Sequence, residues 1–148
     1  MIAMVEDLYD EIRNQADDIR ALNTSEAKLR AQALLQDKRR FNCEPNQKPN
    51  LEVLAGLSPL QRELFSLYGV IEVATGESFL SIYDIRPSEA PGLQYLGGEE
   101  AGNYAIRPGD EAIYLVYSPQ PGGPPRVERN YPTIYHWVLL TDLFFTTE

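Results

Sequence analysis

The hydrophobic pattern of this 148-residue chain changes at Gly69, and that change limits the fold more than any other feature. Before Gly69, apolar residues recur every three or four positions, which is the spacing of amphipathic helices. After it, β-branched and aromatic runs are separated by loops rich in proline and glycine, as in a sheet of hairpins. The order predicts an α+β fold: an N-terminal helical arm, then a helix and a mainly antiparallel β-sheet.

Residues 1–40 are expected to form the arm, coiled-coil-like or a helical hairpin. Asn23 can cap a second helix because Glu26 follows three residues later, the spacing of a capping box. The arm is therefore two helices or one long irregular helix, and it docks either on its own sheet or on another chain. The apolar stripe that makes the arm a candidate for assembly consists of Val5, Leu8, Ile12, Ile19 and Leu22.

A domain boundary is predicted after the arm. The basic run Lys38-Arg39-Arg40 closes it, as cations do at the carboxyl end of a helix. Residues 41–50 contain two prolines and three asparagines without periodicity, so we expect a linker there. The α+β domain then occupies residues 51–148.

Two segments of that domain have clear local signals. Ser58 precedes a first-turn proline and an apolar helical face, which predicts a helix over 59–68 with Gly69 as a left-handed stop. The stretch Arg107-Pro108-Gly109-Asp110 has proline and glycine at the positions that a tight turn favours.

The strands are predicted from β-rich runs. Residues 70–85 indicate a hairpin. Residues 111–118 are apolar on both faces, which predicts a central strand. A last strand is expected at 133–140, followed by a final helix or tail from Thr141.

The charge distribution indicates the kind of partner. The net charge is -9, and residues 63–111 carry nine acids against two arginines. Such a surface repels nucleic acid and attracts a basic protein, although solubility alone also explains it. Tyrosines in the same half suit a contact surface. The candidate partner-binding residues are Glu72, Glu77, Asp84, Glu99, Glu100, Tyr104, Asp110, Glu111 and Tyr114.

The residue inventory gives little basis for catalysis. Cys43 is the single cysteine and lacks flanking cations in its own segment, so neither a disulfide nor a reactive thiolate is expected. His136 is the single histidine, and no nearby motif offers it a nucleophile. We therefore expect no enzyme activity, no catalytic residues, no cofactor and no metal. The chain also lacks a secretory signal and a membrane span, so a reducing cytoplasm is the expected compartment.

Several short motifs between residues 51 and 145 resemble the SMI1/KNR4 (SUKH) superfamily. They are Leu51-Glu52, Leu57-Ser58-Pro59, the helix end Glu63–Gly69, the acidic Gly-Asn segment Gly98–Ile106, the strand Ile113–Val116 and the closing segment Thr141–Phe145. The resemblance implies a non-catalytic bacterial binding domain, typically an immunity protein that neutralises a toxin, often a nuclease.

The favoured hypothesis is a non-enzymatic protein-binding domain, in its narrower form an immunity or antitoxin-type protein with a basic toxin partner. One alternative is a structural or adaptor subunit of a phage or multiprotein assembly that uses the N-terminal helices, possible homo-oligomers included. Another is an acidic DNA mimic, and an unrecognised small-ligand site is a further alternative. Direct nucleic-acid or membrane binding is not expected.

Overall fold

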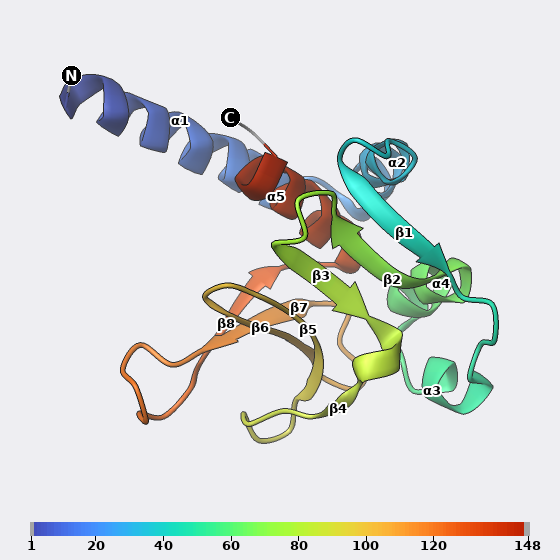
Figure 1. The fold of residues 1–148 in the computed structure, drawn as a ribbon. Helices are drawn as coiled ribbons and strands as arrows, with labels where there is room; N and C mark the ends of the chain where they lie inside the picture. Colours follow the sequence, from blue (N-terminus) through green and yellow to red (C-terminus); the bar gives the residue numbers. More distant parts are fainter. Residues whose placement is uncertain (1, 147–148) are drawn as a thin grey trace.

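The computed structural model describes residues 2–146, which form helices packed on one curled antiparallel sheet (Figure 1). The expected α+β fold is confirmed. No helix within these residues is both long enough and apolar enough to span a membrane. The helices are α1 (Ile2–Arg20), α2 (Thr24–Leu35), α3 (Leu51–Ala55), α4 (Pro59–Leu67), the 3-10 helix η1 (Ile82–Asp84) and α5 (Ile134–Thr146).

The sheet has the order β1-β2-β3-β5-β6-β7-β8, and the short β4 also pairs with β5. All of its pairings are antiparallel. The strands are β1 (Phe41–Pro45), β2 (Tyr68–Val73), β3 (Ser78–Ser81), β4 (Arg86–Pro87), β5 (Gln94–Glu99), β6 (Gly102–Ile106), β7 (Ile113–Tyr117) and β8 (Arg126–Tyr131).

The helix α5 forms the centre of the main core. It packs against β2 and β8 on one side and against α1 and α2 on the other (Figure 1). Trp137 is fully buried, and its ring meets the Tyr104 ring edge-on with centroids 5.4 Å apart. Helix and sheet therefore share one aromatic contact at the centre of the molecule.

The prediction of a strand at 133–140 is wrong, because that segment belongs to α5. Its apolar run is buried on nearly every side, and such a run does not distinguish a strand from an enclosed helix. The helix starts where the hydroxyl oxygen of Thr133 accepts hydrogen bonds from the backbone N–H groups of Tyr135 and His136, at 3.2 and 3.3 Å. Thr133 is the capping signal that the sequence analysis missed.

The predicted linker at 41–50 is also wrong in its first half. Residues 41–45 form β1, which pairs with β2, and Phe41 is part of the core. The strand forms because β2, a segment distant in sequence, pairs with it. The composition of residues 41–50 alone therefore did not indicate a strand. Within the predicted linker, residues 46–50 form neither a helix nor a strand.

The N-terminal residues form two helices with a break at 21–23. The Asn23 side chain accepts a hydrogen bond from the Glu26 N–H at 2.9 Å, as the capping signal predicted. Both helices pack on α5, so the core cluster includes Ala16 of α1 and Ala31 of α2. The arm from Ile12 onward is therefore part of the folded core.

The basic run Lys38-Arg39-Arg40 does not close a helix, since α2 ends at Leu35. Arg39 pairs with Asp37 in the turn that follows. Arg40 reaches α5, where one guanidinium nitrogen lies 2.8 and 3.0 Å from the two carboxylate oxygens of Asp142. This ion pair ties the end of the arm to the last helix.

Gly69 is not a left-handed helix stop, because the chain passes directly from α4 into β2. A Cβ at Gly69 would lie 2.2 Å from the Tyr83 hydroxyl oxygen, so the Tyr83 ring occupies that space. The turn predicted at Arg107–Asp110 is present. Gly109 has φ +80°, and the Asp110 N–H donates to the Arg107 carbonyl at 3.1 Å.

Two neighbouring glycines of β5 give a direct test of this packing. A Cβ at Gly97 would lie 2.0 Å from the Phe79 carbonyl oxygen, whereas at Gly98 the nearest atom is 3.4 Å away. We expect Gly97→Ala to lower the free energy of unfolding by at least ~2 kcal/mol, and Gly98→Ala to change it by less than ~1 kcal/mol. Chemical denaturation measures both, and equal effects would contradict the close approach of β3 and β5.

Candidate functional site

The predicted face of acids and tyrosines does not form, because its two tyrosines are buried. Tyr104 lies in the main core and Tyr114 in a second cluster on the opposite face of the sheet. The second cluster also contains Ala90 and Leu93 from the loop before β5. Since both faces of β6 and β7 are covered, the alternation of side chains places both rings inside.

Two of the predicted acids are bound within the fold. Both carboxylate oxygens of Glu111 accept from the Leu60 N–H at the start of α4, at 3.2 and 3.1 Å. Asp110 accepts hydrogen bonds from the Tyr114 hydroxyl and the Ala112 N–H. The hydrogen bond from Tyr114 is the main cause that lowers the pKa of Asp110. These carboxylates stabilise the turn before β7 and the cap of α4.

The half-buried Glu99 ends a series of hydrogen bonds that runs through the buried Tyr104 and Ser78. The Tyr104 hydroxyl donates to a Glu99 oxygen at 3.2 Å and accepts from the Ser78 hydroxyl at 2.8 Å. Burial raises the pKa of the Glu99 carboxyl, and the hydrogen bond from Tyr104 offsets part of that effect. Burial likewise raises the pKa of Tyr104. These hydrogen bonds join β3, β5 and β6.

The remaining predicted acids are exposed or half-buried and come from separate elements. Glu77 and Glu100 are exposed. They lie at the same end of the sheet because the neighbouring residues Ser78 and Glu99 pair with each other. Glu72 is half-buried on β2, opposite Asn42 and Phe79 in the register, and Asp84 is exposed on η1. These four acids thus belong to different elements: β2, the turn before β3, η1 and the turn after β5.

His136 is a structural residue on α5. It is buried, and its Nε2 lies 2.9 Å from the Leu22 carbonyl oxygen. A carbonyl only accepts, so Nε2 carries the proton and Nδ1 accepts from the Thr133 hydroxyl at 2.7 Å. Both ring nitrogens are occupied by bonds that fix α5 to the end of α1.

Cys43 is equally unsuited to nucleophilic chemistry. Its thiol lies 3.9 Å from the Leu35 carbonyl oxygen, and burial raises the pKa of the thiol to about 11. No group of three or more potential metal ligands occurs within the described residues. A cavity of about 330 Å³ lies between α3 and η1. Among the described residues that line it, Lys48 is the only charged one.

A candidate binding surface is the part of α1 before Ile12, which the core does not cover. Ile12, Ala16 and Ile19 form one face and pack against the core cluster. Leu8 lies four residues before Ile12 on the same face, yet it is 60% exposed, and its neighbour Tyr9 is 65% exposed. Figure 1 shows why: α1 extends beyond the body of the molecule, past the end of α5. The apolar stripe of α1 therefore extends beyond the part of the helix that the core covers.

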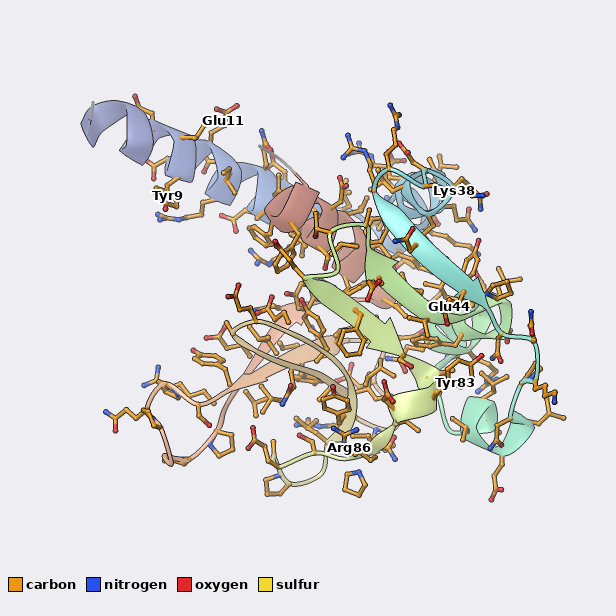
Figure 2. All side chains as sticks on the ribbon, in the orientation of Figure 1. Tyr9, Glu11, Lys38, Glu44, Tyr83 and Arg86 are labelled. Atoms are coloured by element: carbon orange, nitrogen blue, oxygen red, sulfur yellow. The ribbon has the colours of Figure 1, made fainter. Side chains whose placement is uncertain are left out.

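Acidic side chains lie beside this part of the stripe. Asp7, Asp10 and Glu11 are exposed, and Arg13 forms a 3.7 Å ion pair with Asp10. Figure 2 shows Tyr9 and Glu11 on opposite sides of the helix. We call Leu8, Tyr9, Asp7 and Glu11 the α1 surface; Asp10, two residues after Leu8, faces away from it. The α1 surface combines an apolar centre with a negative rim along one side, which suits a cationic amphipathic ligand.

The predicted assembly residues divide between two environments. Ile12, Ile19 and Leu22 are half-buried against the chain's own core, and Leu8 is free. The side chain of Val5 lies outside the described residues. The sequence pattern identified the stripe, but the point at which α5 stops covering it depends on tertiary packing.

Comparison with protein-family models, with curated proteins and with solved structures gives no match to this chain. The proposals below therefore depend on the geometry and chemistry of the chain itself.

The role of His136 can be tested by substitution. His136→Ala leaves the buried Leu22 carbonyl without its donor and opens a cavity, so we expect the free energy of unfolding to fall by about 2 to 4 kcal/mol. His136→Gln can still donate to that carbonyl and should recover part of the loss. An alanine variant as stable as the wild type would contradict the structural role.

The Glu99 environment predicts a pH dependence of stability. Because burial raises its pKa in the folded state, Glu99 binds its proton more tightly folded than unfolded. The folded state disfavours the ionised carboxylate, so the free energy of unfolding falls as the pH rises above 4.5, the ordinary pKa of this carboxyl. We expect Glu99→Gln to gain stability over the wild type between pH ~4 and ~7, measured by denaturation at each pH. Glu77→Gln, at an exposed turn, is the control, and an identical pH trend there would contradict the argument.

Proposed function

We propose that this chain is a non-enzymatic protein-binding module whose contact surface is the α1 surface. The observation that carries the proposal is the continuation of one apolar stripe from the buried Ala16, through Ile12, to the exposed Leu8. Each large apolar side chain that a partner buries contributes about 1.5 to 3 kcal/mol. A helix or apolar segment laid along this stripe would extend the core that α5 begins.

The charge of α1 favours a basic partner. The helix carries six acids, Glu6, Asp7, Asp10, Glu11, Asp17 and Asp18, against two arginines. Two copies of α1 packed together would bring like charges close, which destabilises such a pair. A ligand with lysine or arginine beside its apolar face would instead be attracted and oriented by the rim.

A narrower form of this proposal is an immunity-type role, in which the partner is a basic toxin. Its support is the resemblance of residues 51–145 to the SMI1/KNR4 superfamily together with the net charge of -9. In that case the α1 surface supplies contacts in addition to the region of resemblance. Identification of the protein that co-purifies with the chain tests this narrower form.

A model ligand tests the α1 surface. We expect an amphipathic helical peptide of leucine and lysine, ~18 residues long, to bind the full chain, with affinity that falls when salt is raised from ~0.05 to ~0.5 M. Leu8→Lys should weaken binding at least ~10-fold, because it removes the apolar centre and adds a repelling charge. Fluorescence anisotropy of a labelled peptide measures both effects.

The matched control is Leu51→Lys on α3. Leu51 is 77% exposed, and its substitution changes the net charge of the chain by the same amount as Leu8→Lys. If both variants weaken binding equally, the peptide recognises overall charge and the α1 surface is not the site. A peptide with the same composition but no apolar face should bind more weakly to the wild type.

A further inference from the structure

The cavity between α3 and η1 has the lining of a small-molecule site. Its volume of about 330 Å³ lies near the lower end of the ~300 to 1,000 Å³ that ligand pockets occupy. Figure 1 shows α3 beside the segment between β3 and β4, which contains η1. The apolar lining residues are Val53, Leu54, Ile82 and Ile85, and the polar ones are Asn46, Lys48, Asn50 and Tyr83. Such a lining suits a molecule with an apolar body and one polar head.

Asn46 fixes one side of this cavity to the end of α4. Its backbone N–H donates to the Leu67 carbonyl at 3.0 Å, and its side-chain Nδ2 donates to the Phe65 carbonyl at 2.8 Å. Both carbonyls belong to the last turn of the helix, where no intrahelical donor is available to them. The loop that carries the polar lining is therefore held in place by hydrogen bonds at the point where it leaves β1.

Tyr83 forms a second side of the cavity, and its position is also fixed. The side chain is 57% exposed, but its ring lies against β2 at Gly69, where a Cβ would overlap it. Its hydroxyl donates to the Asn46 Oδ1 at 3.4 Å. A wall that is already in place lowers the ordering cost of binding, and a phenol ring offers edge or offset contacts to another ring.

The charge of the lining selects the polar head of the ligand. Lys48 is exposed and is the only charged residue among the described residues that line the cavity. The acids nearest to the lining in sequence, Glu52 and Asp84, are exposed and do not line it. The Asn50 side-chain oxygen already accepts from two N–H groups of α3, at 3.1 and 3.2 Å. One ammonium group beside apolar side chains favours a ligand with a single negative charge.

We propose that this cavity binds a small aromatic monocarboxylate. The ring packs on the buried Leu54 and Ile82 and contacts the Tyr83 ring, while the carboxylate stays at the opening and pairs with Lys48. An apolar cavity of ~150 Å³ holds a benzene molecule, so the larger volume here also accommodates a short acid chain. Figure 1 shows α3 and α1 at opposite ends of the molecule, which makes this site separate from the α1 surface.

Hydrocinnamate, a phenyl ring on a short acid chain, is the probe that tests the proposal. Titration of the full chain, followed by two-dimensional NMR of the backbone amides at ~0.15 M salt, should give a Kd of ~1 mM or tighter. The signals that shift should belong to residues 46–54 and 82–85. Lys48→Met keeps the length of the side chain without its charge and should weaken binding at least ~3-fold. The neutral hydrocinnamamide should bind the wild type and Lys48→Met equally.

The matched control is Lys38→Met, the same change at an exposed lysine beside a different cavity, and it should bind hydrocinnamate as the wild type does. Val53→Phe fills part of the site and should weaken both the acid and the amide at least ~10-fold. Leu8→Lys should leave binding unchanged, so failure of the α1 surface and failure of this site are distinguishable. The inference is overturned by absence of binding at ~10 mM, by shifts confined to other residues, or by equal affinity of Lys48→Met and the wild type for the acid.

Discussion

The packing of α5 between the sheet and the N-terminal helices is the constraint on which the rest of the structure depends. Trp137 meets Tyr104 on the sheet side, while His136 binds the Leu22 carbonyl on the other. Asp142 extends this connection to Arg40 at the entry to β1. Helices α1 and α2 therefore stabilise α5, and α5 stabilises them, through these shared contacts.

The same packing decides how the charged and phenolic groups are used. Three buried tyrosines donate to carboxylates of the chain: Tyr104 to Glu99, Tyr114 to Asp110 and Tyr135 to Glu63. Each ring fills the interior while its hydroxyl ends at an acid near the surface, so both polar groups are satisfied. Internal bonding thus accounts for these three tyrosines and for the acids that they contact.

Binding capacity remains where internal packing ends. On α1 this happens because the helix continues past α5, so that Leu8 follows the buried stripe without a cover. At β1 the sheet ends, and no strand among residues 2–146 pairs with its outer side.

The sequence by itself determined the features that depend on neighbouring residues: the Asn23 cap, the helix that begins at Pro59, the turn at Gly109 and the spacing of the α1 stripe. Tertiary structure decided whether residues 134–146 became helix or strand, whether 41–45 joined the sheet, and which way Tyr104 and Tyr114 face. The reason is physical. Caps and turns are set by local backbone geometry, whereas burial on both faces and strand pairing depend on segments that meet only in the folded chain.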